Sequence, residues 1–241
     1  MRILLAGATG VIGRPLLTLL VRAGHDVTGT TRSAARVGAI AASGAVPAVV
    51  DVFDEDGLRE AARVARPEVV IHQLTNLPDE ADPAKIAASL AANARIRIEG
   101  TRNLIIAAKA AGARRMVAQS IAFMYAPGPE PHAETDTLMP GGNDGSVDAR
   151  GVHALEDAVT ATPGLDGVVL RYGRLYGPGT WTLVAQGRAP LHVDAAAHAA
   201  LLALTHGAPG IYNIAEDDGA VTISKARDQL GFDPGFRLPP A

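Results

Sequence analysis

The sequence predicts an α/β fold in which a doubly wound parallel sheet is covered by helices on both faces. Short aliphatic and β-branched runs alternate with longer Ala- and Leu-rich runs through residues 1–120. The short runs are nearly continuous in apolar residues, which is typical of parallel strands buried on both faces. A chain of 241 residues that is 48% hydrophobic and 20% charged has enough apolar surface for a sizeable core.

The first half of the chain is expected to alternate strictly between strands and helices. The expected strands are 2–6, 26–31, 46–50, 68–74 and 116–119, and the expected helices are 11–23, 33–42, 55–65 and 83–111. Asp82 before Pro83 indicates a helix N-cap followed by a first-turn proline. Gly24 and Gly112 stand where helices should end.

The second half begins with a long segment that lacks periodicity. Residues 126–147 are rich in Pro, Gly and polar residues, a composition typical of either a functional lid or a disordered segment. The elements expected after it are a helix at 152–162, a strand at 167–171, a turn at 177–179, a helix at 195–205, a strand at 211–214 and a helix at 224–230.

A glycine-rich loop connects the first expected strand to the first expected helix. Its sequence is Gly7-Ala8-Thr9-Gly10-Val11-Ile12-Gly13. Such a loop brings backbone N–H groups and the positive end of a helix dipole close to a diphosphate, where side chains would block the approach. Because strand, loop and helix occur in the required order, we expect a dinucleotide to be bound by Gly7, Thr9, Gly10, Val11, Ile12 and Gly13.

This loop defines the expected domain organisation. Residues 1–175 are predicted to form a dinucleotide-binding domain of Rossmann type. Residues 176–241 are predicted to form a small, shortened C-terminal substrate-binding region packed on that domain, without being an independent domain.

The end of the second expected strand indicates which dinucleotide is bound. About 20 residues after the loop, an acidic residue normally holds the NAD ribose, but this chain has Thr30-Thr31-Arg32-Ser33 there. Arg32 and Ser33 suit a 2′-phosphate, so NADP is favoured over NAD. The alternative is that Arg32 is a solvated residue at a helix start. Asp51, followed by Val52, is a candidate for hydrogen bonding the adenine, or else a helix N-cap.

The chain resembles the extended and atypical branch of the short-chain dehydrogenase/reductase superfamily, the NAD-dependent epimerase/dehydratase family. The resemblance covers about residues 1–215. It rests on Gly7–Gly13, Asp51, Gly100–Leu104, Gln119–Tyr125, Glu134, Leu170–Gly179 and His192–Asp194. It implies hydride transfer between a nicotinamide and a substrate carbon, with a protein hydroxyl handling the proton.

The resemblance also implies roles for individual residues. Ser120, after the fifth expected strand, would hydrogen-bond the reacting oxygen, or would otherwise cap the strand end. Leu74 and Thr75 would pass beneath the cofactor. Tyr172 and Arg174 belong to a segment that would line the nicotinamide pocket.

The chain departs from the family at the proton-transfer residues. Alignment through Glu156 places Asp148 and Val152 at the positions of the family's Tyr and Lys, and Arg97 where the family has Asn. Tyr125 is the predicted substitute as proton donor or substrate anchor. The alternative is that Tyr125 packs its loop onto the body of the protein.

Two hypotheses of function follow. The first is an NADP-dependent oxidoreductase or epimerase acting on a small carbonyl or hydroxyl compound, sugar-like or a secondary metabolite. The second, motivated by Asp148 and Val152, is a dinucleotide-binding sensor without catalysis. A non-redox isomerase or lyase on the same fold also stays open.

The composition of the chain limits the classes of partner that we expect it to bind. The net charge of −3 argues against nucleic acid. No apolar run reaches the length of about 18 residues that a membrane span needs, so no membrane partner and a cytoplasmic location are expected. The scattered histidines and the absence of cysteine indicate no metal site. Helices 83–111 and 152–162 resemble the family's dimer interface and favour a homodimer, although their Ala-rich faces also suit packing on the sheet.

Overall fold

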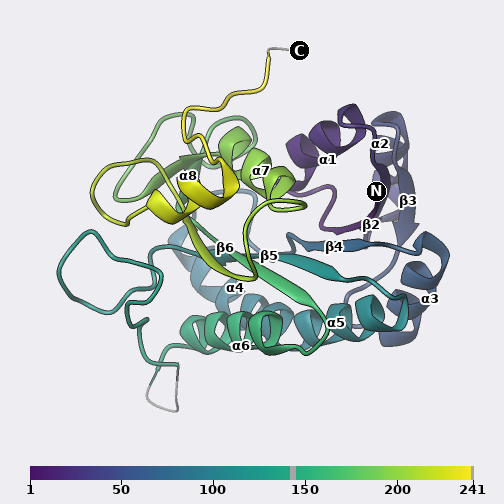
Figure 1. The fold of residues 1–241 in the computed structure, drawn as a ribbon, viewed down its shortest axis with the longest axis horizontal. Helices are drawn as coiled ribbons and strands as arrows, with labels where there is room; N and C mark the ends of the chain where they lie inside the picture. Colours follow the sequence, from purple (N-terminus) through teal and green to yellow (C-terminus); the bar gives the residue numbers. More distant parts are fainter. Residues whose placement is uncertain (142–144, 240–241) are drawn as a thin grey trace.

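The computed structural model describes residues 1–141 and 145–239. Its centre is a seven-stranded sheet in the order β3-β2-β1-β4-β5-β6-β9, and every pairing in it is parallel (Figure 1). The strands are β1 (Arg2–Ala6), β2 (Asp26–Thr31), β3 (Val46–Val49), β4 (Val69–His72), β5 (Arg115–Ile121), β6 (Asp166–Tyr172) and β9 (Gly210–Ile214). The predicted doubly wound α/β fold is confirmed.

Helices cover both faces of this sheet. In Figure 1, α1 (Gly13–Arg22), α7 (Val193–Leu202) and α8 (Ser224–Leu230) lie above the sheet. On the opposite face lie α4 (Pro83–Arg95), α5 (Thr101–Ala110) and α6 (Val147–Ala161). The remaining helices, α2 (Val37–Ala42) and α3 (Glu55–Ala65), flank the first three strands.

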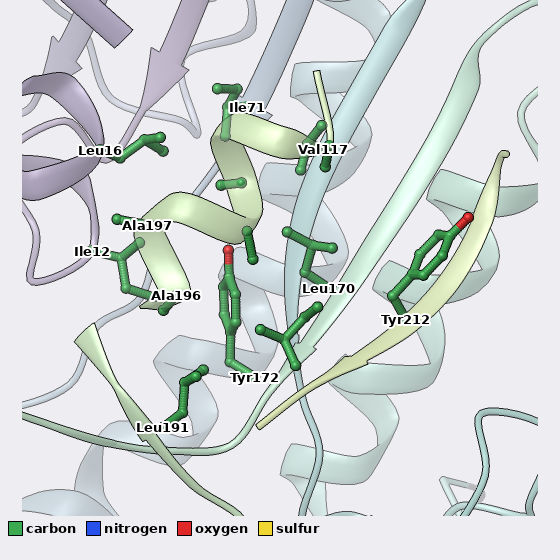
Figure 2. Close-up of a cluster of buried hydrophobic side chains, with 14 of the residues drawn as sticks. Ile12, Leu16, Ile71, Val117, Leu170, Tyr172, Leu191, Ala196, Ala197 and Tyr212 are labelled. Carbon is green, nitrogen blue, oxygen red and sulfur yellow. The ribbon is translucent and has the colours of Figure 1, made fainter. Parts of the chain in front are cut away.

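Each face of the sheet has its own apolar core. One core joins the sheet to α1 and α7, and Figure 2 shows Leu16 of α1 and Ala197 of α7 facing Ile71, Val117 and Leu170 of the strands. The other core includes Leu58 of α3, Leu104 of α5 and Leu155 of α6. Because both faces are covered, the strands need the nearly continuous apolar sequence from which they were predicted.

The chain reverses direction across the sheet after β3. It builds β1, β2 and β3 outward in one direction and then crosses back to place β4 on the other side of β1. Ligands of open α/β sheets bind outside the carboxyl ends of the strands at such a switch point. The fold therefore places a binding cleft above β1 and β4, beside the glycine-rich loop.

Several predicted elements differ in their bounds. The expected helix 83–111 contains a π-helical segment, Ile96–Gly100, between α4 and α5. The helix expected at 152–162 begins earlier, at Val147, because the Ser146 hydroxyl accepts a hydrogen bond from Ala149 N and caps it. A short 3₁₀ turn, Ala34–Arg36, precedes α2.

The C-terminal region, predicted from residue 176 onward, contributes β9 to the main sheet and α7 to one of its faces. Sequence analysis missed two short strands, β7 (Arg174–Tyr176) and β8 (Pro190–His192), which pair in parallel with each other. Among the described residues, no helix is long and apolar enough to cross a lipid bilayer.

The segment predicted at 126–147 as a lid or disordered stretch is held to the body of the protein by backbone hydrogen bonds. Met139 N donates to Met124 O, His132 N donates to Ala220 O, and Thr222 N donates to His132 O. Residues 142–144 of that prediction lie outside the described residues.

Candidate functional site

The glycine-rich loop forms a tight turn between β1 and α1. Gly7 has φ +91°, and a Cβ atom at Gly13 would lie 2.0 Å from the carbonyl oxygen of Gly7, so neither position accepts a side chain without rearrangement. A Cβ at Gly10 would meet only the Gly7 carbonyl within 4 Å. The outer side of Gly10 is therefore open to an approaching ligand.

Backbone donors at this loop are available to an anion. Gly10 N donates to Gly7 O and Arg14 N donates to Gly10 O, but Val11 N and Ile12 N have no acceptor among the described residues. These two N–H groups lie at the positive end of α1. The loop therefore presents open backbone donors and a positive helix end where the sequence predicts the diphosphate of a dinucleotide.

A cavity lies beside the loop, above the carboxyl ends of β1, β2 and β4. Four predicted cofactor residues line it: Arg32, Val52, Leu74 and Thr75. The other lining residues are Ala6, Thr30, Thr31, Val50, Phe53, Leu58 and Ile96. With the loop on one side and apolar walls on the others, the cavity has the position and chemistry of an adenosine pocket.

Asp51 does not line this cavity. Its carboxylate accepts a hydrogen bond from Phe53 N at 2.9 Å and so stabilises the turn after β3. The N-cap of α3 is Asp54, which accepts a hydrogen bond from Gly57 N. Sequence analysis missed Phe53, whose ring lies 3.9 Å from the Arg95 guanidinium. An aromatic residue two positions after the expected adenine-binding acid was the available signal.

The end of β2 presents a second arginine that was not predicted. Arg36 donates a hydrogen bond to the Thr9 hydroxyl at 3.3 Å, which ties the residues after β2 to the glycine-rich loop. Arg32 is exposed at the cavity, and Ser33 is the residue before the 3₁₀ turn. Together Thr9, Arg32, Ser33 and Arg36 form a polar, cationic edge. The spacing of four residues between the arginines was the missed signal.

The predicted nicotinamide segment is largely engaged within the protein. Tyr172 is only 2% exposed, packs among Leu170, Leu191 and Ala196 in Figure 2, and accepts a hydrogen bond from Gln73 Nε2 at 3.2 Å. Burial raises the pKa of the Tyr172 phenol. The second amide atom, Gln73 Oε1, has no partner among the described residues although it is buried.

The backbone of this segment is also hydrogen-bonded. Ala122 N donates to Tyr172 O, Gly173 N donates to Ile214 O, and Arg174 N donates to Ala189 O. The Arg174 side chain is exposed.

Ser120 belongs to a buried ionic network. Its hydroxyl donates to Glu156 Oε1 at 2.6 Å, and Arg171 donates to both oxygens of the same carboxylate, at 2.9 and 2.6 Å. All three residues are at most 4% exposed. The network ties β5, β6 and α6 together, and it commits the Ser120 proton to Glu156.

Tyr125 is likewise held on both sides. Its hydroxyl donates to Asn213 Oδ1 at 2.6 Å and accepts from Arg171 at 2.8 Å, while its ring stacks on His132. Burial raises the pKa of the Tyr125 phenol. These contacts favour the alternative weighed for Tyr125, an aromatic residue that packs its loop onto the body, and no contact directs its hydroxyl toward the cleft.

Different residue types occupy the positions of the family's proton-transfer pair. Arg97, in the π-helical segment, forms a half-buried ion pair with Asp148 in the first turn of α6. Val152, one turn further along, is buried in the apolar core. His72 lies nearby at the end of β4, where burial and then the charge of Arg97 lower its pKa to about 3. A phenol with a lysine beside it is absent from this position.

In the described part of the chain, no group of three or more His, Asp or Glu side chains is placed to hold a metal ion.

Comparison with known proteins agrees with this geometry. The sequence pattern of the NAD dependent epimerase/dehydratase family matches residues 3–189. A 3-diazoavenalumate denitrifying reductase from a Streptomyces species is 41% identical over 269 aligned residues, spanning 100% of this chain and 85% of the relative.

Solved structures share the fold at lower identity. The UDP-glucose 4-epimerase of Thermotoga maritima has a TM-score of 0.81 at 19% identity and covers 98% of this chain and 94% of that one. A UDP-glucuronic acid 4-epimerase from Bacillus cereus, in complex with NAD, has a TM-score of 0.78 at 18% identity over 98% and 95% of the two chains.

Proposed function

The chain belongs to the NAD dependent epimerase/dehydratase family, and we propose that it is an NADP-dependent reductase that removes nitrogen from a diazo carboxylate. The family relationship supports an NAD(P)-dependent oxidoreductase or epimerase. The diazo substrate comes from the printed name of the relative that is 41% identical. The single observation that carries the proposal is that Asp148, which pairs with Arg97, and Val152 stand at the positions of the family's Tyr–Lys pair.

The diazo group reacts here in its cationic diazonium form, and carbonyl and diazonium reduction then differ in their need for a proton. A ketone that accepts a hydride becomes an alkoxide and must be protonated, which is the task of a positioned phenol. A diazonium group that accepts a hydride gives R–H and dinitrogen, R–N₂⁺ + H⁻ → R–H + N₂, and the charges balance without a proton. When bound, the reduced dinucleotide supplies that hydride.

The residues at the reacting end suit the second reaction. Asp148 forms an ion pair with Arg97, so the side chain at the tyrosine position is a carboxylate engaged by a guanidinium and not a phenol. The Tyr172 and Tyr125 phenols are buried and hydrogen-bonded within the protein. A site without a poised acid is unsuited to ketone reduction and sufficient for diazonium reduction.

The preference for NADP is supported by the cationic edge defined above. Arg32 lines the cavity and Arg36 donates a hydrogen bond to the Thr9 hydroxyl, so the segment after β2 carries two guanidinium groups. Guanidinium groups bind phosphate through paired, charge-assisted hydrogen bonds. No acidic residue at this edge repels a 2′-phosphate, because residues 30–33 are Thr-Thr-Arg-Ser.

A matched pair of substrates tests the reaction. The purified chain is mixed with NADPH and either a diazonium-substituted cinnamate or the corresponding formyl cinnamate, and loss of reduced nicotinamide is measured against enzyme-free blanks. We expect oxidation with the diazonium compound and none with the aldehyde. Reduction of the aldehyde alone would overturn the proposal.

The sensor hypothesis predicts a different result from the same experiment. A sensor would bind NADPH in calorimetry but oxidise it with neither compound. The double variant Asp148→Tyr plus Val152→Lys restores the family's pair. If the proposal holds, aldehyde reduction appears in this variant while diazonium reduction, which needs no proton donor, persists.

A further inference from the structure

Two side chains that the cofactor site does not use meet above the carboxyl ends of β5 and β6. These strands are neighbours in the sheet, with Ile121 paired to Tyr172. Phe123 follows β5, and Arg174 follows β6 after one glycine. The Arg174 guanidinium lies 4.4 Å from the centre of the Phe123 ring. Both are therefore at the edge of the sheet where α/β enzymes bind substrates.

The Arg174 side chain is held on a second side by backbone. Gly187 has φ +68°, and a Cβ atom there would lie 3.3 Å from Arg174 Cδ and 3.6 Å from its Nε. The Arg174 stem thus lies between an aromatic ring and a bare stretch of main chain. This packing restricts the side chain before any ligand arrives, which lowers the entropy lost on binding.

The Arg174 guanidinium nevertheless has no acceptor within the part of the chain that the structure describes. No hydrogen bond or ion pair from this group is found, although it has five N–H donors. Arg171, three residues earlier, has Glu156, and Arg188, one residue after Gly187, has Glu130. A positioned arginine beside partnered ones, with its donors free, is suited to an anion from outside the chain.

The Phe123 ring indicates what kind of group is attached to the anion that Arg174 would bind. Phe123 is 40% exposed, so part of its surface is accessible to a ligand beside the guanidinium. A planar apolar group can stack there while an attached carboxylate takes two parallel hydrogen bonds from Arg174. The two side chains together match an aromatic or conjugated carboxylate.

We propose that Arg174 and Phe123 form a clamp that binds the carboxylate and the planar body of an aryl carboxylate substrate. The inference rests on the proposed function, because it names the substrate class of the same reductase site. It gives the Arg174 side chain a role in substrate binding rather than in holding the cofactor.

Calorimetry with cinnamate and its neutral analogue cinnamamide tests the clamp without turnover. Both compounds are titrated into NADP-saturated protein. We expect the wild-type chain to bind cinnamate at least about 10-fold more tightly than cinnamamide, as one charge-assisted pair provides. Arg174→Met should weaken cinnamate binding at least about 10-fold and change cinnamamide binding by less than about twofold.

Two further variants are matched controls. Arg188→Met removes the same charge from the residue after Gly187, but from an arginine that already pairs with Glu130, so cinnamate binding should not change. Phe123→Leu removes the stacking surface and keeps Arg174, so both ligands should weaken by a similar factor. NADPH binding should stay within about twofold in all three variants, as expected for residues that do not contact the dinucleotide.

Three results would overturn the clamp. These are equal binding of acid and amide by the wild-type chain, absence of cinnamate binding, or an Arg174→Met variant that loses NADPH affinity instead. Because no turnover is measured, these outcomes are distinct from a failure of diazonium reduction. Tight, Arg174-dependent cinnamate binding in a chain that does not reduce diazonium compounds would support the clamp and refute the reaction.

Discussion

At the residue scale, the most costly group to disturb is the buried ionic network around Arg171. Its guanidinium is almost completely buried and binds Glu156, the Tyr125 hydroxyl and the Glu134 carbonyl. A buried pair adds modest net stability, but removing one partner leaves an uncompensated charge in the core. Ser120 and Tyr125, chosen from the sequence as catalytic candidates, both take part in this network.

We expect Arg171→Met to destabilise the fold by about 3–5 kcal/mol, because Glu156 is left buried without its cation. Urea unfolding measures the change. The double variant Arg171→Met plus Glu156→Leu should recover most of it, since no charge remains buried. If Arg171→Met alone lowers the free energy of unfolding by less than about 1 kcal/mol, solvent reaches Glu156 in the folded protein.

His72 makes stability depend on pH. Its pKa is about 3 in the fold, from burial first and Arg97 second, and about 6.5 in the unfolded chain. The unfolded state therefore binds more protons between these values, so stability is complete above pH about 6.5 and falls as the pH drops toward 3.

The variant His72→Asn, which keeps an acceptor for Leu74 N, removes this dependence. From pH 5 to pH 7, the free energy of unfolding of the wild type should rise by about 2 kcal/mol relative to that of the variant. The slope is about 1.4 kcal/mol per pH unit below pH 6.5. Parallel stability curves for the two proteins would contradict a neutral, buried His72.

Arg36 tests the choice of dinucleotide at a single residue. Arg36→Ala should weaken NADPH binding by about 10-fold and leave NADH binding within about twofold, because only the 2′-phosphate needs the guanidinium. Arg22→Ala, an exposed arginine in the last turn of α1, is the matched control. Equal losses for both dinucleotides would assign Arg36 to the diphosphate instead.

At the element scale, the π-helical segment between α4 and α5 directs two successive residues, Ile96 and Arg97, into different contacts. Ile96 lines the cavity beside the glycine-rich loop, and Arg97 pairs with Asp148 of α6. Such wide turns within helices are frequent at functional sites. The α4–α6 contact behind them is close, because a Cβ at Gly151 would lie 2.8 Å from Ala94 Cα and 3.3 Å from Arg97 Cδ.

Gly151→Ala should therefore separate the two helices and displace Arg97. We expect a loss of stability of about 1–3 kcal/mol from overpacking. Gly38→Ala is the control, because Gly38 lies in α2 with nothing near a new Cβ. That variant should be neutral or up to about 1 kcal/mol more stable. Equal unfolding midpoints for the two variants would contradict the close α4–α6 contact.

Local sequence patterns were sufficient to predict the strands and turns whose conformation depends on neighbouring residues. The strands 2–6 and 26–31 have the predicted bounds, and the glycine-rich loop has the predicted turn. The short strands β7 and β8 were missed because three residues show no periodicity and their pairing spans the 177–189 segment. The Tyr125 hydroxyl donates a hydrogen bond to Asn213, which lies 88 residues away in the sequence. A local sequence pattern cannot predict such a distant partner.

At the scale of the whole molecule, a homodimer stays a proposal. The outer face of α4 presents Ala87 and Ala91 to solvent, and Ile98 after it is 45% exposed. Small residues on such a face permit close contact with the same face of a second copy. We expect light scattering to give a dimer and Ala91→Arg to give a monomer. A monomeric wild type at high concentration would contradict the proposal.

The whole-molecule account depends on a reductase that needs no proton. Its most direct test is proton uptake in weakly buffered solution with NADPH and a diazonium cinnamate, measured with dinitrogen release. The account predicts one dinitrogen for each NADPH oxidised and no proton taken up. Uptake of one proton for each NADPH oxidised, or oxidation without dinitrogen, would contradict it.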